Sequence, residues 1–376
     1  MTEGGFVGTN GERLNELALS LRRVTQVATR HEASGRHAPG VPPVTRPAEA
    51  RPGSLADVPR RRIGHSDIEI PPVALGTSVF GWTMDRPTSV AVLDHYVDVG
   101  GEFIDTADNY AAGMSETMIG NWMRARRARD RVTLATKVGR GSEFPGLGRA
   151  AIHGAVDASL ERLGTDHVDV LYFHIEDRTV PLEDSLAAAH ELIQAGKVRV
   201  LGASNFSGAR LVEARVLSAM GLPRFETIQE HYNLMHREEY EADISLAASS
   251  QGLGVLPHYA LAHGFLGGAY RRRADGIGNA RRARAGQYLN RRGLRVLSVL
   301  DRISAQRGVS TARIALAWLL ARPGVVAPVV SADSLMHVDE LAAATTLLLG
   351  PEEIADLDRV SAPERRRNRE LNRQVD

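Results

Sequence analysis

The sequence predicts an α/β protein built on a closed (β/α)8 barrel of the TIM type, with a β-hairpin plug and a flexible N-terminal extension. Short β-rich runs alternate with helical patterns from about residue 60 onward, and this strand-and-helix unit occurs eight times. Such alternation indicates a parallel sheet with right-handed crossovers, and eight units in about 300 residues favour the closed barrel. The alternative is an open doubly wound sheet. That fold usually carries a glycine-rich phosphate turn after its first strand, and "LGTSVFGW" is not one.

The predicted strands follow one another at regular intervals. They cover residues 72–77, 101–108, 131–138, 167–174, 197–204, 225–232, 252–259 and 324–331. Helical periodicity fills the intervals between them. One helix has four apolar residues on one face and should end at Gly164: Ile152, Val156, Leu160 and Leu163. Ser207 is placed to cap another helix, and Ser115 a third with Glu116 in its first turn.

Two segments depart from the plain repeat. "RRRIGHSDIEI" (60–70) alternates around a turn, as a hairpin closing the floor of the barrel would. After the seventh strand, residues 262–293 form a long glycine-rich and arginine-rich connection. A connection of this length in a compact domain is usually functional or disordered.

The two ends of the chain have a different composition from the barrel. Residues 1–58 are predicted to be a flexible extension, because much of this segment is rich in Pro, Gly, Arg and Ala. Within it, residues 12–30 have the pattern of a short helix, and Glu12 and Glu16 argue against a transit peptide. The barrel is expected to cover residues 59–362, and residues 363–376 to form a charged tail.

Composition excludes several classes of function. The 376 residues are 43% hydrophobic and 24% charged, with a formal net charge of +1 and no cysteine. Disulfides, thiolate metal sites and cysteine nucleophiles are therefore excluded, and bulk charge gives no argument for a nucleic-acid partner. No segment approaches the roughly 20 apolar residues of a membrane span. We expect a soluble, cytoplasmic protein with a small-molecule partner. The sequence leaves its oligomeric state open.

Polar residues recur at the ends of the predicted strands. In barrels of this type the C-terminal ends of the strands carry the active site, and five strands end in a polar side chain: Asp105, Lys137, His174, Ser204 and Gln229. Successive members lie 25 to 37 residues apart, about one strand-and-helix unit. Taken singly, each is more readily a turn, cap, surface or packing residue. Their recurrence at equivalent positions predicts one site at one rim of the barrel.

These segments resemble a known family in order and spacing. "GGEFIDTADNYAAGMSETMIG", "LATKVGR", "DHVDVLYFHIED", "KVRVLGASNFS" and "TIQEHYNLM" look like the successive signature segments of the aldo-keto reductase superfamily. The likeness runs from about residue 60 to 360 and includes "GVSTARIALAWLLARPGV" and "LGPEEIADLD". It implies an NAD(P)H-dependent oxidoreductase that interconverts aldehydes or ketones and alcohols, and that binds its cofactor without a Rossmann fold.

The resemblance also implies a catalytic tetrad at Asp105, Tyr110, Lys137 and His174. A free phenol titrates near pH 10, so we expect the ammonium group of Lys137 to lower the pKa of Tyr110. Asp105 would keep Lys137 charged, and a neutral His174 would position the substrate carbonyl. Tyr110 is then the general acid of the reduction, and its phenolate is the base of the reverse oxidation.

By the same resemblance, Ser204, Asn205 and Gln229 would bind the nicotinamide carboxamide, with His258 or the adjacent Tyr259 stacked on the ring. The other expected cofactor contacts are Gly76, Thr77, Leu261, Gly264, Leu266, Ser331, Asp333, Ser334 and His337. Relatives often have a basic residue where this chain has Asp333, and a carboxylate repels a 2′-phosphate. NADP(H) is the family's usual cofactor, but NAD(H) or dual use is therefore an open alternative. The arginines of the long connection could compensate.

Trp82 and His174 are expected to line the substrate pocket. Two other classes of function remain as alternatives. One is a non-catalytic or regulatory barrel that binds a nicotinamide cofactor. The other is a metal-dependent hydrolase built on His231, His258 and His263, although strand ends with Lys, Ser and Gln are not metal ligands. We expect no metal.

Overall fold

The computed structural model describes residues 53–272, 275 and 282–363. Eight parallel strands form one sheet in the order β10-β3-β4-β5-β6-β7-β8-β9. The strands are β3 (Ala74–Gly76), β4 (Phe103–Asp105), β5 (Thr133–Val138), β6 (Val168–Phe173), β7 (Val198–Ser204), β8 (Phe225–Gln229), β9 (Gly254–Val255) and β10 (Val329–Val330). A parallel bridge between Val255 and Val325 connects β9 to the segment that leads into β10, so the sheet closes on itself. The predicted (β/α)8 barrel is confirmed.

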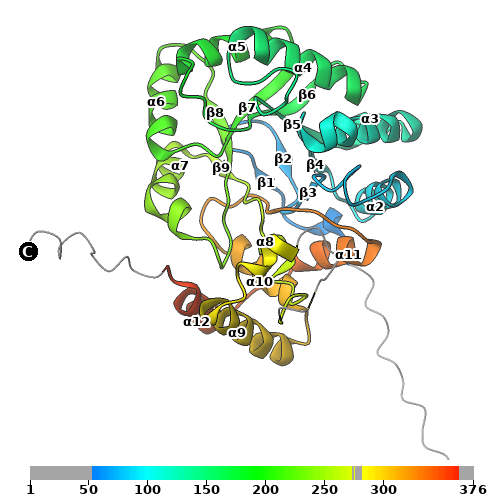
Figure 1. Cartoon of the computed structure of the whole chain (residues 1–376), viewed down its shortest axis with the longest axis vertical. Helices are drawn as coiled ribbons and strands as arrows, with labels where there is room; N and C mark the ends of the chain where they lie inside the picture. Colours follow the sequence, from blue (N-terminus) through cyan, green and yellow to red (C-terminus); the bar gives the residue numbers. More distant parts are fainter. Residues whose placement is uncertain (1–52, 273–274, 276–281, 364–376) are drawn as a thin grey trace, which may run out of the picture. The chain divides into compact units, whose positions relative to one another are not determined.

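The helices lie around the strands (Figure 1). They are α2 (Arg86–Asp98), α3 (Met114–Arg126), α4 (Arg149–Leu163), α5 (Leu182–Gln194), α6 (Gly208–Ala219), α7 (Ser245–Gln251), α8 (Arg282–Gly286), α9 (Arg291–Arg307), α10 (Thr311–Leu320), α11 (Leu335–Ala344) and α12 (Pro351–Ser361). None of them, within the described residues, is long and apolar enough to cross a membrane.

Two of the three predicted helix boundaries are confirmed. The predicted apolar face of α4 is buried, and the helix ends at Gly164 in the left-handed conformation. Ser207 caps α6 by accepting a hydrogen bond from the amide of Arg210. The predicted cap at Ser115 is wrong. The residue before α3 is Gly113, with a φ of 85°, and Ser115 is buried inside the helix. The Ser115 hydroxyl instead donates to the carbonyl oxygen of Thr77, at 3.1 Å.

The predicted hairpin is present and lies at the floor of the barrel. Strands β1 (Arg61–Arg62) and β2 (Glu69–Ile70) pair in antiparallel register. Ile63, Ile68 and Ile70 are buried in a cluster with inward-facing residues of the barrel strands. The amide of His65 donates to Glu226 near the start of β8, at 2.7 Å. The hairpin therefore covers the N-terminal ends of the strands, opposite the predicted site.

Packed structure begins before residue 59. A short 3₁₀ turn, η1 (Leu55–Asp57), precedes the hairpin, and Leu55 and Val58 belong to the hydrophobic core. The amide of Leu55 donates to the carbonyl oxygen of Val99 at 2.7 Å. Residues 1–52 and the tail from residue 364 lie outside the described residues, so the predicted extension and charged tail stay predictions.

Candidate active site

Three of the predicted catalytic side chains meet at the ends of β4 and β5. The ammonium nitrogen Nζ of Lys137 donates to Oδ2 of Asp105 at 2.6 Å and to the carbonyl oxygen of Thr106 at 2.8 Å. It lies 3.4 Å from the phenol oxygen of Tyr110. Asp105 and Lys137 are almost completely buried. A lysine held between a carboxylate and a phenol is the arrangement that the sequence predicted.

Strand pairing explains how these residues come together. Asp105 pairs with Ala135, two residues before Lys137 on the neighbouring strand. Beyond the strand, the amide of Asp108 donates to the carbonyl oxygen of Lys137 at 3.0 Å, so the chain continues along β5. Tyr110 then begins the turn η2 (Tyr110–Gly113), in which Ala111 and Ala112 have φ values of 47° and 53°. Two non-glycine residues in this conformation are strained, and they lie directly after the tyrosine.

The electrostatics of the cluster differ in part from the sequence prediction. Burial lowers the pKa of Lys137, but Asp105 and Tyr110 outweigh it and the pKa is raised overall, so the amine stays charged. For Tyr110, burial raises the pKa more than Lys137 lowers it, and the net direction is upward. Lys137 therefore acts on the pKa of Tyr110 in the expected direction, and the larger effect of burial was not foreseen. Lys137 opposes the effect of burial but does not overcome it.

His174 follows β6 and faces the tyrosine. Its amide donates to the carbonyl oxygen of Val138 at 2.9 Å. The rings of Tyr110 and His174 are edge to face, with centroids 6.1 Å apart and planes at 81°. Burial, followed by the charges of Lys137 and Arg140, lowers the pKa of His174 to about 2, so the imidazole is neutral. This agrees with the expectation for a hydrogen-bond donor to a carbonyl.

The three residues expected to bind the carboxamide lie beside this cluster. Ser204 and Gln229 are paired in register at the ends of β7 and β8. The amide nitrogen Nε2 of Gln229 donates to Oδ1 of Asp105 at 2.9 Å. Asn205 donates through Nδ2 to the carbonyl oxygen of His174 at 2.9 Å and to the Ser204 hydroxyl at 3.0 Å. The predicted cofactor and catalytic residues therefore share one hydrogen-bonded network.

His258 connects the end of β9 to the same network. Its Nε2 lies 3.2 Å from Oδ1 of Asn205, and its ring contacts that of Tyr259, with centroids 4.8 Å apart. Burial lowers the pKa of His258 well below its ordinary value. Tyr259 is half exposed and has a φ of 51°. Both rings thus lie next to the predicted carboxamide site.

The donor set fits a nicotinamide cofactor. A carboxamide needs both donors and acceptors, and the Ser204 hydroxyl and the Asn205 and Gln229 amides supply both. Nδ1 of His174 and Nδ1 of His258 are buried without a protein partner, and a bound ligand could satisfy such atoms.

Several of the predicted cofactor contacts offer little free side chain. The Leu266 side chain is buried in the core, Leu261 is partly buried, and Gly264 has a φ of 94°. Thr77 is buried and its hydroxyl donates to the carbonyl oxygen of Asp105 at 2.9 Å, so this side chain bonds to the protein. A Cβ placed on Gly76 would lie 3.6 Å from the Ser331 hydroxyl, so the two positions adjoin across β3 and β10.

The region expected to bind the adenosine carries an ion pair. Asp333 Oδ1 lies 2.6 Å from Nδ1 of His337 near the start of α11, and both side chains are half exposed. Ser334 caps that helix. Among the loop arginines, Arg271 pairs with Asp301 of α9 at 2.6 Å. Arg273, Arg281 and the Arg282 side chain lie outside the described residues.

Exposed apolar side chains occur in the loops around the cluster. Trp82, in the loop after β3, is 53% exposed, and Ile175 directly follows His174 and is also exposed. A Cβ on Gly81 would come within 2.6 Å of Met114, so the Trp82 loop packs against the segment that carries Tyr110. This placement is compatible with the predicted substrate contact of Trp82.

Several histidines gather beyond β8 and β9 without forming a metal site. The rings of His231 and His236 are stacked with centroids 3.8 Å apart, and His263 lies 6.4 Å from His231. Across the described residues, no group of three His, Cys, Asp or Glu side chains could hold a metal ion. The metal-dependent alternative therefore has no ligand set in this part of the chain.

Two buried carboxyl groups near the cluster escaped the sequence analysis. Asp108 lies between Asp105 and Tyr110, and burial raises its pKa to about 6. Glu230 directly follows Gln229, and burial raises its pKa to about 8. Their positions beside predicted site residues were a usable signal, but an acidic residue at a strand end is also a common turn residue.

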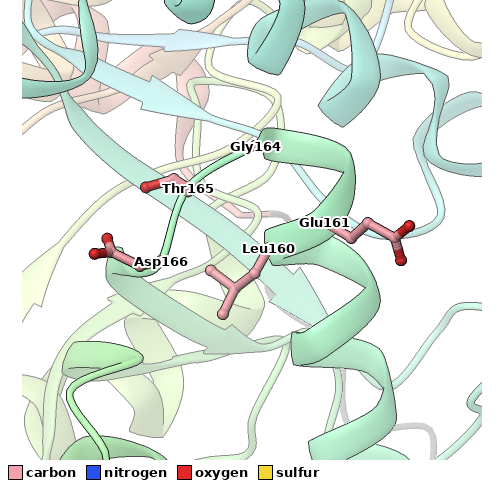
Figure 2. Close-up of a pocket in the computed structure, with 5 residues that line it drawn as sticks. All are labelled: Leu160, Glu161, Gly164, Thr165 and Asp166. Carbon is pink, nitrogen blue, oxygen red and sulfur yellow. The ribbon is translucent and has the colours of Figure 1, made fainter.

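A separate surface hollow lies away from this site. It is lined by Leu160, Glu161, Gly164, Thr165 and Asp166, where α4 turns into β6 (Figure 2). This turn precedes β6, whereas His174 follows it, so the hollow lies at the opposite end of the strand. Thr165 accepts a hydrogen bond from Arg129 at 3.1 Å, and Asp166 pairs with His167 at 2.7 Å. The side chains of Thr165 and Asp166 are thus engaged within the protein.

Comparison with known proteins gives one consistent result. A model of the Aldo/keto reductase family matches residues 72–362. A norsolorinic acid reductase of Aspergillus flavus is 31% identical over 330 residues, covering 83% of each chain. An aldo-keto reductase of Alternaria alternata is 33% identical, covering 79% of this chain and 90% of its own. An uncharacterized oxidoreductase of Bacillus subtilis is 32% identical, covering 77% of this chain and 92% of its own. The chain belongs to the aldo/keto reductase family, and it is an oxidoreductase of the carbonyl-reducing type.

Proposed function

We propose that this protein reduces an aldehyde or ketone with a nicotinamide cofactor, and that Tyr110 gives the proton to the carbonyl oxygen. The observation that carries this proposal is the buried contact of Lys137 with both Asp105, at 2.6 Å, and the Tyr110 phenol, at 3.4 Å. A proton donor beside a fixed cation suits a reaction in which negative charge develops on oxygen.

The bound cofactor would supply the hydride. As the carbonyl π electrons move to oxygen, that oxygen takes the proton from Tyr110 and leaves a phenolate. The ammonium group of Lys137 stabilises the phenolate, and Asp105 keeps the ammonium charged and oriented. His174, neutral at physiological pH, donates a hydrogen bond that orients the carbonyl.

The two directions of the reaction need Tyr110 in different protonation states. Reduction needs the protonated phenol, and a phenol whose pKa burial raises above its ordinary value is protonated at neutral pH. The reverse oxidation needs the phenolate as base, and its rate should therefore increase towards alkaline pH. Reduction is accordingly the proposed direction near neutrality.

Ser204, Asn205 and Gln229 would hold the carboxamide, and His258 would stack on the nicotinamide ring. The hydrogen bond between His258 and Asn205, at 3.2 Å, supports the choice of His258 over Tyr259. The family resemblance aligns Asp333 with a basic residue of relatives that contacts the 2′-phosphate, and in this protein Asp333 pairs with His337 at 2.6 Å. We therefore propose that the protein accepts NADH as well as NADPH.

For the substrate we propose a carbonyl compound with bulky apolar or aromatic groups, in a cytoplasmic setting. The exposed side chains of Trp82, Ile175 and Tyr259 near the cluster support this choice. The relatives named as norsolorinic acid reductases support reduction as the direction.

The test combines cofactor titration with turnover. NADPH and NADH are titrated into the protein by fluorescence, and a panel of aliphatic and aromatic aldehydes and ketones is then assayed. Asp333→Arg should improve the Kd for NADPH relative to NADH roughly 3- to 10-fold, because a repulsive charge becomes attractive. Asp339→Arg, on α11 a few residues after Asp333 but paired with His95, is the matched control and should leave the ratio unchanged.

Each outcome of this test decides one part of the proposal. Binding of neither nucleotide would defeat the proposed function. Binding without turnover of any carbonyl would favour the non-catalytic alternative. An unchanged Kd ratio in Asp333→Arg would place the 2′-phosphate elsewhere.

A further inference from the structure

The turn between β7 and α6 is held by two carboxyl groups. Asn205 has a φ of 54°, in the left-handed region that non-glycine residues rarely adopt. Directly after it, the amide of Phe206 donates to Oε1 of Glu230 at 2.8 Å. The amide of Ser207 donates to Oε2 of Glu176 at 3.0 Å. Two consecutive amides are therefore fixed by side chains from the segments that follow β6 and β8.

Glu230 is unusual in its surroundings. Its residue is only 7% exposed, directly after the last residue of β8. Burial raises its pKa to about 8, the amides of Phe206 and Asn205 act in the opposite direction, and the neighbouring charges that act on it are the carboxylates of Glu239 and Glu176. Burying a carboxyl group costs free energy unless hydrogen bonds within the protein replace those lost to water. Among the described residues, no ion pair compensates for the burial of the Glu230 carboxyl group. The hydrogen bond from the Phe206 amide does compensate for it.

The turn controls several side chains of the site at once. Asn205 bonds to the carbonyl oxygen of His174 and to the Ser204 hydroxyl through Nδ2, and to His258 through Oδ1. Asn205 makes these contacts from a left-handed backbone conformation. A shift of this backbone would move Ser204, Asn205 and His258 together, because they belong to one network.

We propose that Glu230 is a positioning residue that holds the Asn205 turn in the conformation that presents Ser204 and Asn205 to the cofactor. The proposal rests on the proposed cofactor role of these two residues. Glu230 acts through the backbone and does not itself touch the reacting atoms. Without its acceptor oxygen the Phe206 amide is left buried and unpaired, and the turn relaxes towards a less strained conformation.

The experiment compares Glu230→Leu, Glu230→Gln and the control Glu226→Leu in the full-length protein. Glu226 lies on β8, the strand that Glu230 directly follows, and also accepts a hydrogen bond from a backbone amide, that of His65 at 2.7 Å, but at the opposite end of the barrel. The readouts are the Kd for NADPH and NADH by fluorescence titration, the melting temperature, and kcat against KM for the cofactor.

Glu230→Leu should weaken cofactor binding roughly 10- to 100-fold, with the loss in KM for the cofactor rather than in kcat. Glu230→Gln should stay within about threefold of the natural protein, because its amide oxygen still accepts from Phe206 and the natural carboxyl is largely protonated at pH 7. Glu226→Leu should melt at a lower temperature but bind the cofactor normally.

The proposal is overturned if Glu230→Leu binds the cofactor as well as the natural protein, or if Glu230→Gln is as weak as Glu230→Leu. If Glu230→Leu does not fold, Glu230→Asp replaces it. Its shorter side chain should not reach Phe206, so normal cofactor binding by that variant also overturns the proposal. Failure of the natural protein to bind either nucleotide would instead defeat the proposed function, so the two failures are distinguishable.

Discussion

Tyr110 is a partly buried phenol whose neighbours act on its pKa in opposite directions. Burial raises the pKa, Lys137 lowers it, and Asp105 raises it again. The outcome is a phenol that is protonated at rest but lies 3.4 Å from a cation. The attraction between the Lys137 ammonium and the phenol oxygen grows as negative charge appears on that oxygen. Lys137 therefore stabilises the state in which the proton is being transferred more than the state before transfer.

Replacing Tyr110 with phenylalanine removes the proton donor and leaves the ring. We expect turnover to fall about 10²- to 10⁴-fold, the usual contribution of a general acid, while the Kd for the cofactor changes less than threefold. Steady-state reduction rates and fluorescence titration check the two parts.

Tyr172→Phe is the matched control for this change. Tyr172 is also buried, its ring centroid lies 5.9 Å from the Lys137 ammonium, and its hydroxyl contacts Thr227 at 3.3 Å. This variant loses a phenol near the same lysine and should keep most of its activity. Equal turnover in natural protein and Tyr110→Phe would contradict the acid role.

Single residues were predictable where a spacing rule applied to them. Lys137 and Asp105 end neighbouring strands, so their proximity follows from parallel pairing. The net pKa of Tyr110 was not predictable, because it depends on how much solvent the fold removes from the phenol. Glu230 was missed for a similar reason: its function lies in a bond to the backbone of Phe206, which no side-chain pattern reveals.

Whole elements were predictable from periodicity, and their ends less so. The eighth strand was expected at 324–331, but only Val329–Val330 pairs with β3, and Val325 pairs with Val255 instead. Pro328 lies between the two and has no N–H to donate. The cap of α3 was mispredicted because the Ser115 hydroxyl bonds to the carbonyl oxygen of Thr77 inside the protein instead of to an amide at the helix end.

The β-hairpin gives a test at this scale. Ile70→Ala should reduce the free energy of unfolding by about 2–5 kcal/mol, because it leaves a cavity among buried side chains. Turnover per folded molecule should be unchanged, since the hairpin covers the N-terminal ends of the strands. Chemical denaturation and active-site titration measure both quantities.

Arg62→Ala, on the exposed side of the same hairpin, should change the free energy of unfolding by less than about 1 kcal/mol. If Ile70→Ala lowers turnover as much as stability, the hairpin is coupled to the site and the separation of the two barrel ends is wrong.

At the scale of the whole barrel, one end of the strands carries the stabilising hairpin and the other end carries the predicted site. The strand rhythm predicted this division, because every polar strand end fell on one rim and the alternating hairpin on the other. What the rhythm could not predict is how many ionisable groups the rim buries. His174 is buried and His231 and His258 are partly buried, and all three have lowered pKa values, whereas Asp108 and Glu230 have raised ones.

These groups make stability depend on pH in a direction that can be worked out. Consider a histidine whose pKa is lowered by folding. At a pH between its folded and its unfolded pKa, it binds a proton only in the unfolded chain. Its contribution to stability is complete above the unfolded pKa of about 6.5 and is lost as the pH falls. Asp108 and Glu230 act in the opposite direction, because their folded pKa values are raised. Below pH 6 the three histidines outnumber the two carboxyls, so these five groups together should reduce stability on acidification.

The contribution of a single histidine, His231, to the pH dependence of the unfolding free energy can be measured. Burial lowers its pKa to about 3, so His231→Phe should reduce the slope of unfolding free energy against pH by about 1.4 kcal/mol per unit between pH 4.5 and 6. Urea unfolding at several pH values gives the slope, and the phenyl ring keeps the stack on His236. His65→Phe is the control, since that ring is largely in solvent in the folded protein. An unchanged slope in His231→Phe would mean that His231 takes up its proton in the folded protein too.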